Sequence, residues 1–350
     1  MSSARTSEVF DLKKAIILAG SIGIALALAG GGLIVWIDAV IMRSHKEIGI
    51  ADKTDNINVM LTRPAQWRKL AEHPALPKYE MDMIDGSTAT IPITAELFRQ
   101  FYDMTDHSVN ENRIVLHSTT HSAYLMLINR EHRIHDIGRS TDLILVTPPS
   151  EEEKQYAADK NVELDLTAIA LDGFVFITHK DNPVSSLTVE QIQDIYTGKI
   201  TNWKQVGGED LDIQAYQREP NSGSQTAMEQ LVMQGKPMSP PAEILQAAGM
   251  GMLIEAVAEY ANGPTALGYT YAYYMNNLYK NEHIKIIPID GIAPTHDNLR
   301  GGTYPFTTQY YAVIRGDEPE DSPARTLRDY LVTPEGQSLI EMAGYCRAVD

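Results

Sequence analysis

From residue 81 onward, short apolar runs alternate with longer segments that are apolar on one face. The short runs are rich in β-branched residues and predict strands: RIVLH, DLILVT, GFVFIT and IKIIPID. The longer segments predict helices: ITAELFRQFYDM, SAYLMLINRE, TVEQIQDIYTG, SQTAMEQLVMQG and SPARTLRDYLVTPEGQSLIEMAG. Strands that alternate with helices are typical of an α/β fold with a largely parallel sheet.

The segment from Ala15 to Ile37 contains no charged residue. At about 1.5 Å of rise per residue a helix of this length reaches about 34 Å, which is enough to cross a bilayer core of about 30 Å. No small-residue cleavage site follows, so residues 15–42 predict an uncleaved transmembrane anchor rather than a signal peptide. Lys13 and Lys14 favour a cytoplasmic N-terminus at residues 1–14 and an extracytoplasmic domain. A buried core helix is the alternative.

Charge and composition narrow the function of the rest of the chain. Residues 43–80 contain several prolines and mixed polar runs, and they predict a tether to a domain at 81–350. With 29 basic and 46 acidic residues the net charge is -17, which argues against nucleic acid as a partner but not against a small anion. The single cysteine, Cys346, excludes an intramolecular disulfide and a cysteine-based metal site. The histidine spacings fit no recognised zinc pattern, so we expect neither a metal nor a cofactor.

Three junctions at which a helix is predicted to begin are rich in hydroxyl groups. Their residues are Ser87, Thr88 and Thr90 in DGSTATIP, Ser118, Thr119 and Thr120 in LHSTTHSAY, and Ser222 and Ser224 around Gly223 in NSGSQ. Helix capping explains any one of them. In open α/β sheets, however, ligands lie where strands end and helices begin, and helix N-termini favour anions. Arg218 adds a planar cation close to the third junction, and no nucleotide-binding glycine loop is present, so the pattern predicts a small oxyanion site.

At these motifs, residues 81–350 resemble the phosphate-binding, PstS-like branch of the type 2 periplasmic (substrate-)binding proteins. DGSTATIP is similar to the first anion loop of that family, and REPNSGSQ to its Arg-x-x-x-Ser-Gly-Thr/Ser motif. The most specific match is NPVSSLTVEQIQDIYTGKITNWKQVGG, which resembles the signature of the second lobe. Further similar segments are TDLILVTPPSEEE, GPTALGYTYAYY, YYAVIRGDEP and YLVTPEGQSLIEMAGY. The sequence departs from the family at HSTTHSAY, where many phosphate binders have a glycine-rich serine loop, and at Ser224 and Gln225, where threonine is commoner.

The resemblance implies a two-lobed α/β domain with two crossovers that closes on phosphate for an ABC permease. The first lobe would comprise about 81–172 and 266–350, and the second about 173–265. Arg218 and Ser222 to Ser224 would supply the motif of the second lobe. Asp142 would be the carboxylate that accepts the proton of phosphate and thereby excludes sulfate.

Two other functions remain open from the sequence. The same fold could bind another oxyanion or a small organic anion, or could act as an anion sensor. A serine hydrolase that uses Ser222 or Ser224 is disfavoured, because there is no G-x-S-x-G motif and no His/Asp pair placed to activate a serine. We expect a monomeric binding protein rather than an enzyme.

Overall fold

The computed structural model describes residues 67–111, 115, 117–132, 140–241, 246–247, 250–258 and 263–349. Contacts divide the chain into two units, Met1–Asn56 and Ile57–Asp350. The predicted anchor at 15–42 and the first part of the predicted tether lie outside the described residues. Among the helices that the structure does describe, none combines the length and the apolar character needed to cross a bilayer.

Within the described residues, eight strands form one mixed sheet with the order β1-β2-β9-β3-β7-β4, and β8 and β10 also pair with β3. The strands are β1 Ile84–Gly86, β2 Leu143–Val146, β3 Leu164–His179, β4 Gln214–Ala215, β7 Ala266–Tyr271, β8 Ile284–Ile287, β9 Thr307–Arg315 and β10 Cys346–Arg347. A separate parallel pair joins β5, Gln217–Arg218, to β6, Gln246–Ala247. The prediction of a largely parallel sheet is wrong, because every described partner of β3 is antiparallel to it.

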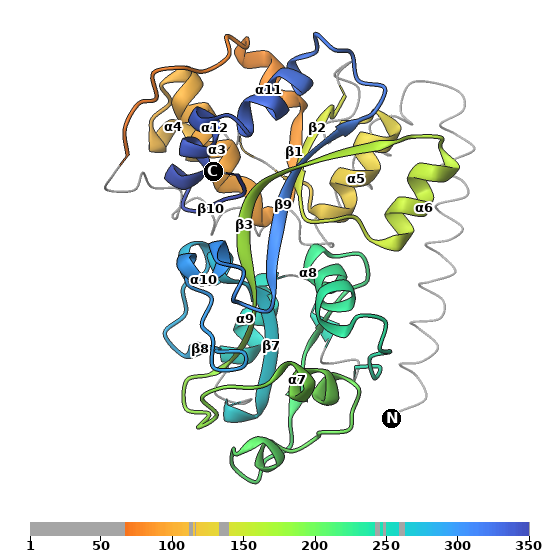
Figure 1. Ribbon diagram of the computed structural model, residues 1–350, viewed down its shortest axis with the longest axis vertical. Coiled ribbons are helices and arrows are strands. Elements are labelled where there is room, and N and C mark those ends of the chain that lie inside the picture. Colours follow the sequence, from red (N-terminus) through yellow and green to blue (C-terminus); the bar gives the residue numbers. More distant parts are fainter. Residues whose placement is uncertain are drawn as a thin grey trace, which may run out of the picture. The chain divides into compact units, whose positions relative to one another are not determined.

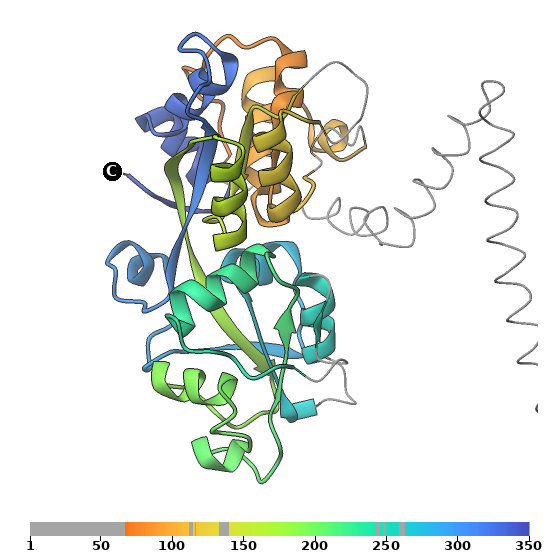
Figure 2. The same cartoon turned by 90° about the vertical axis from the view of Figure 1, so that its right-hand side faces the viewer.

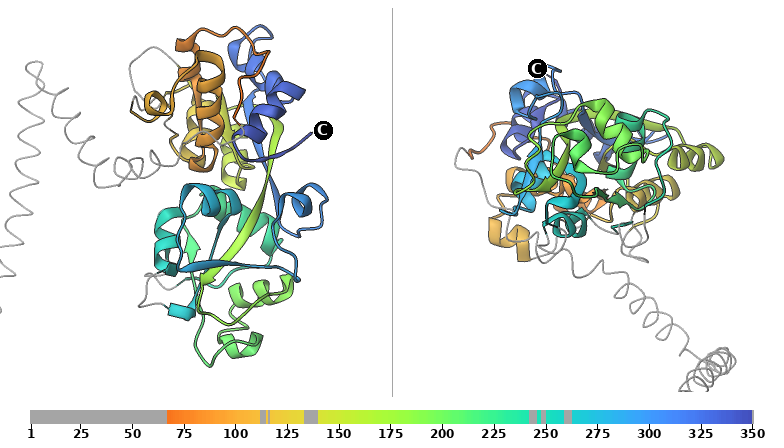
Figure 3. Two further views of the ribbon diagram at one scale, coloured as in Figure 1. Left: turned by 90° about the vertical axis from the view of Figure 1, so that its left-hand side faces the viewer. Right: turned by 90° about the horizontal axis from the view of Figure 1, so that it is seen from below.

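Two long strands link the lobes. The first half of β3 pairs with β9, from Leu164 opposite Arg315 to Gly173 opposite Thr307. Its second half pairs with β7 and β8. β3 therefore carries the chain from the first lobe into the second, and β9 carries it back (Figure 1). The left view of Figure 3 shows β3 running from one lobe into the other, seen from another side.

The return to the first lobe comes later than the sequence predicts. The predicted boundary at residue 266 assigns β7 and β8 to the first lobe, but both strands pair with the second half of β3. The apolar pattern of β8 identifies it as a strand without identifying its partner. We therefore define the first lobe as residues 67–172 and 307–349, and the second as residues 173–306.

Helices cover the sheet in both lobes (Figures 1 and 2). The α-helices are α3 Ile91–Tyr102, α4 Asp106–Glu111, α5 Thr120–Asn129, α6 Glu151–Asp159, α7 Val189–Tyr196, α8 Gly223–Ala227, α9 Met250–Ala258, α10 His296–Arg300, α11 Pro323–Leu331 and α12 Pro334–Met342. Shorter 3-10 helices are η1 Lys78–Met83, η2 Thr88–Thr90, η3 Trp203–Val206 and η6 Gly263–Thr265. Two π-helical segments are η4 Met228–Met233, which continues α8, and η7 Tyr274–Leu278.

Most of the predicted elements are present, one lies largely outside the described residues, and one differs. The strand predicted at RIVLH falls largely outside the described residues. The long helix predicted at the C-terminal end is divided into α11 and α12. Thr333 caps α12 by accepting a hydrogen bond from the Gly336 N–H (3.1 Å), and Pro334 at the first position of α12 has no N–H with which to continue α11.

The part of the predicted tether that the structure describes is packed on the first lobe. The Trp67 indole N–H donates to Glu96 Oε1 (2.7 Å) on α3. The Leu70 N–H donates to Gln100 Oε1 (2.9 Å), and Gln100 Nε2 donates to the Arg68 carbonyl oxygen (2.9 Å). The folded domain therefore begins before residue 81, and polar sequence alone did not reveal these contacts.

Candidate functional site

At the first junction, hydroxyl groups that were predicted to bind a ligand make contacts within the protein. Thr90 is fully buried, and its hydroxyl lies within hydrogen-bonding distance of the carbonyl oxygens of Leu145 (2.6 Å) and Ser87 (2.9 Å). His117 Nδ1 contacts the Ser87 carbonyl oxygen (2.7 Å), and its Nε2 contacts the Thr94 hydroxyl (3.0 Å). These bonds fix the loop against the end of β2. Thr88, at the start of η2, remains partly exposed.

At the second junction, a buried aspartate that the sequence analysis overlooked fixes Ser118. Asp85 on β1 has no exposed surface. Its Oδ1 accepts from the N–H groups of Gly86 and Ser118, both at 2.7 Å, and its Oδ2 accepts from the Ser118 hydroxyl at 2.6 Å. The available signal was an acidic residue at the end of a short apolar run. Asp85 thereby positions the start of α5, whose first residue, Thr120, is buried.

The backbone at Thr119, the N-cap of α5, is strained. Its φ of 84° and ψ of 161° fall in a region that is adopted almost only by glycine, at a cost of about 1–3 kcal/mol for other residues. The side chain is exposed and makes no capping hydrogen bond. Because glycine removes this strain but loses about 0.5–1 kcal/mol of backbone entropy, we expect Thr119→Gly to raise the free energy of unfolding by about 0.5–2 kcal/mol in denaturant titrations.

A matched control is Thr188→Gly, at the N-cap of α7. Thr188 has an ordinary φ of -83°, and its hydroxyl accepts from the Gln191 N–H (3.0 Å). This variant should lose a few tenths of a kcal/mol. A loss of stability in Thr119→Gly as large as that in Thr188→Gly would show that position 119 stores no strain.

At the third junction, Arg218 and Ser224 lie together as predicted. Arg218 is 8% exposed on β5, and its Nη1 donates to Ser224 Oγ (3.2 Å). Its backbone N–H contacts the Tyr269 hydroxyl (2.9 Å), and its Nη2 lies 3.5 Å from the Glu219 carboxylate. Burial lowers the pKa of Arg218, and the charge of Glu219 opposes that shift. The guanidinium is thus held rigidly in a largely dry environment.

The hydroxyls of the two lobes meet at Gly223. A Cβ atom on Gly223, in the second lobe, would lie 2.5 Å from Thr147 Oγ1 and 2.7 Å from Thr120 Oγ1, in the first lobe. The glycine is therefore required for the close approach of α8 to the start of α5 and the end of β2 (Figures 1 and 2). Nearby, Gln230 Nε2 donates to the Pro149 carbonyl oxygen (3.1 Å) across the same boundary.

Thr147 is a site residue that the sequence analysis missed. It directly follows β2 and is 1% exposed, and its hydroxyl lies beside the Tyr271 hydroxyl, where its hydrogen bond opposes the burial that raises the pKa of Tyr271. The neighbouring Tyr271 hydroxyl donates to the Gly223 carbonyl oxygen (2.8 Å). The signal was present in the sequence, because Thr147 stands at the carboxyl end of a buried strand, where ligands bind in α/β folds.

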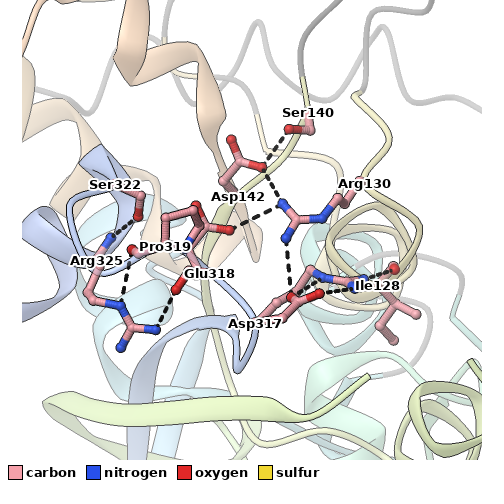
Figure 4. A network of polar contacts seen from close by, with 10 residues as sticks. Ile128, Arg130, Ser140, Asp142, Asp317, Glu318, Pro319, Ser322 and Arg325 are labelled. Carbon is pink, nitrogen blue, oxygen red and sulfur yellow. Dashed lines mark hydrogen bonds and ion pairs between the residues drawn. The ribbon is translucent and has the colours of Figure 1, made fainter. Parts of the chain in front are cut away.

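Asp142 is at the opposite end of the same strand. Arg130 Nη1 lies 3.7 Å from its carboxylate and 3.2 Å from that of Glu318, and Arg130 Nη2 lies 3.2 Å from Asp317 (Figure 4). At about 3.3 Å per residue, Asp142 is about 16 Å from Thr147 along the strand. The structure thus places Asp142 in an ion-pair network and does not bring it together with Arg218, contrary to the sequence-based expectation.

Comparison with known proteins decides the family. The model of a family described as a PBP superfamily domain matches residues 84–335, which is more than two thirds of the chain. The chain belongs to this family. The resemblance predicted from the motifs is thereby confirmed, together with the type 2 fold of the PBP superfamily.

Relatives of this PBP superfamily chain include phosphate-binding proteins. The phosphate-binding protein PstS of Borreliella burgdorferi is 24% identical over 269 residues, covering 75% of this chain and 88% of the relative. The PstS protein of Staphylococcus epidermidis is 25% identical over 268 residues, covering 75% and 77%.

Two solved structures share both sequence and fold with this PBP superfamily chain. A structure from Clostridium perfringens, assigned as a phosphate ABC transporter substrate-binding protein and solved with bound phosphate, is 26% identical with a TM-score of 0.57. The match covers 76% of this chain and 98% of the Clostridium perfringens chain. An ABC-type phosphate transport receptor from Vibrio cholerae is 25% identical with a TM-score of 0.53, covering 75% and 98%.

Proposed function

We propose that this protein is a substrate-binding protein that captures inorganic phosphate between its two lobes for an ABC-type importer. The observation that carries the proposal is the convergence at Gly223: the buried Arg218–Ser224 pair of the second lobe faces the buried hydroxyls of Thr120 and Thr147 in the first. The PstS relatives and the phosphate-bound structural relative support phosphate as the ligand.

The chemistry of these groups suits a tetrahedral oxyanion. The guanidinium of Arg218 supplies fixed, charged N–H donors, and hydrogen bonds to an ionised partner are about twice as strong as neutral ones. The N-terminus of α5 adds free N–H groups and a partial positive charge next to Thr120. Burial of these donors strengthens each interaction with an anion that displaces water from the site.

The remaining predicted residues have supporting roles in this proposal. Ser222 caps α8 by accepting a hydrogen bond from the Gln225 N–H (3.3 Å). Ser87 and Thr90 hold the first loop, and Asp85 holds Ser118. Among the described residues no imidazole contacts either serine hydroxyl of the third junction, so neither has a base to activate it, and the arrangement favours binding over hydrolysis.

The cellular setting is part of the same proposal. Residues 15–42 would anchor the protein in the membrane as a single-pass helix, and the binding domain would lie on the extracytoplasmic side, next to an ABC permease. A monomer is sufficient for this role, because both halves of the site come from one chain.

Gly223→Ala tests the convergence at the lobe boundary. Its methyl group would overlap the hydroxyls of Thr120 and Thr147, and overpacking of this kind costs about 1–3 kcal/mol. We therefore expect calorimetric titration to show phosphate affinity reduced by about ten- to a hundredfold. The melting temperature without phosphate should be unchanged, because opening of the lobes relieves the overlap.

Gly316→Ala, in the turn after β9, is the control. There the added methyl group would lie 3.1 Å from Glu163 Cβ, in the first lobe and away from the residues at Gly223, so phosphate affinity should be unchanged. Equal affinities in wild type and Gly223→Ala would place the phosphate site elsewhere.

A further inference from the structure

The hydroxyls that face each other across the lobe boundary are all deeply buried. Thr120 is 6% exposed, Thr147 is 1% exposed and Ser224 is 3% exposed. The Thr147 hydroxyl lies beside Gly223 and the Tyr271 hydroxyl, both of the other lobe. A hydroxyl has one donor and two acceptor positions, so the contact with Tyr271 leaves capacity for a hydrogen bond to a bound anion.

The buried carboxylates around this position are engaged elsewhere. Both oxygens of Asp85 accept hydrogen bonds from Gly86 and Ser118. Both oxygens of Glu153 are occupied, one by His121 Nδ1 (2.9 Å) and one by the Ser150 N–H (2.7 Å).

The other carboxylates described near this position do not reach the buried hydroxyls. The half-exposed Glu219 contacts Arg218, and Asp142 lies at the far end of β2. In the part of the chain that the structure describes, no carboxylate contacts Thr120, Thr147 or Ser224.

We propose that the described residues of this anion site offer no carboxylate acceptor for a ligand proton, and that the site therefore binds sulfate with an affinity comparable to that for phosphate. The inference rests on the proposed function and specifies its ligand class as tetrahedral oxyanions, whether or not they carry a proton. A site rejects an unprotonated analogue strongly only when one of its own buried groups is left unpaired by that analogue.

Thr147 supplies the reason for this tolerance. A hydroxyl can donate to an unprotonated oxygen of sulfate, and it can equally accept the proton of phosphate. A carboxylate at the same position can only accept, so it would face an oxygen of sulfate with like charge and no bridging proton. Selectivity should therefore depend on the residue at position 147.

The experiment is calorimetric titration of the full chain with phosphate and with sulfate, at one ionic strength and near neutral pH. For wild type we expect affinities within about tenfold of each other. Thr147→Asp should bind sulfate at least about a hundredfold more weakly than phosphate, because the new carboxylate opposes only the unprotonated anion. Thr147→Val, which removes the hydroxyl at nearly constant volume, should weaken both anions by a similar factor.

Thr303→Asp is the matched control, since it adds the same charge at an exposed position, and it should leave the ratio of affinities unchanged. Binding of phosphate with rejection of sulfate by wild type would overturn the inference while leaving the proposed function intact. Binding of neither anion by wild type would overturn the proposed function itself.

A folded Thr147→Asp variant with the wild-type ratio would also overturn the inference, because Thr147 would then not face the ligand. Far-ultraviolet circular dichroism identifies a variant that fails to fold. If Thr147→Asp fails to fold, the ratio of phosphate to sulfate affinity in wild type and the affinities of Thr147→Val test the inference.

Discussion

Replacement of Arg218 by alanine should weaken phosphate binding by about ten- to a hundredfold. Arg218 is buried and held against Ser224 at 3.2 Å, so its charge is directed at the lobe boundary rather than at solvent. A charge-assisted hydrogen bond contributes about 1.5–3 kcal/mol, which corresponds to this range of affinity. Calorimetric titration with phosphate measures the effect.

Arg218→Lys separates charge from geometry. Lysine keeps the positive charge but loses the planar fork that can contact two oxygens of one anion, so its affinity should lie between those of wild type and Arg218→Ala. A change of less than threefold in Arg218→Ala would show that Arg218 does not contact the ligand.

Asp172 should make the protein less stable as the pH rises from about 4 to about 7. It lies on β3 where the strand passes from one lobe to the other, and it is fully buried. Burial raises its pKa to about 7, although the N–H groups of Gly173 (2.7 Å) and Tyr273 (3.1 Å) and the Tyr310 hydroxyl (3.1 Å) favour the charged form.

The direction of the effect follows from proton linkage. Between the unfolded pKa near 3.8 and the folded pKa near 7, the folded state holds a proton that the unfolded state has lost. The stabilisation that comes from the proton on Asp172 is fully present below the unfolded pKa and is lost as the pH rises through the folded pKa. At about 1.4 kcal/mol per pKa unit, the change over this window is about 4 kcal/mol.

Asp172→Asn isolates this contribution, because its amide can accept from the two N–H groups and donate to the Tyr310 oxygen at any pH. Denaturant titrations between pH 4 and pH 8 should show the variant gaining stability over wild type as the pH rises. His121, whose pKa Glu153 raises, adds a loss of stability above its unfolded pKa of 6.5 in both proteins, so it cancels in the comparison.

Asp317→Asn is the control for Asp172→Asn. Arg315 lowers the pKa of Asp317 to about 2, so Asp317 titrates below this window. Its removal should leave the slope of the free energy of unfolding against pH unchanged above pH 4. If the free energies of unfolding of wild type and Asp172→Asn changed with pH in parallel, the pH-dependent loss of stability could not be assigned to Asp172.

The sequence predicted those features that local pattern determines. Apolar periodicity identified α3, α5 and α7, and the capping residue Thr188 marks the start of α7 in the sequence. The spacing from Arg218 to Ser224 also identified two side chains that the structure brings into contact. In each case the interacting residues are close in the chain, so their geometry follows from one helix or loop.

Features that depend on long-range pairing were not predictable in the same way. The pattern of β8 predicted a strand, but only the register of β7 and β8 against β3 shows to which lobe the two strands belong. Asp142 and Thr147 stand at the two ends of one apolar run, and the resemblance to the family implied only the carboxylate. The fold places Thr147 against Gly223 and Asp142 against Arg130. Asp85 was missed because its partners come from a separate segment.

The most direct test of the central claim is a calorimetric titration of the full wild-type chain with inorganic phosphate, with citrate as the comparison ligand. The site at Gly223 is formed once per chain and is lined by buried donors suited to a small tetrahedral anion. The predicted result is saturable binding of one phosphate per chain and no binding of citrate. Binding of citrate without binding of phosphate would contradict the account.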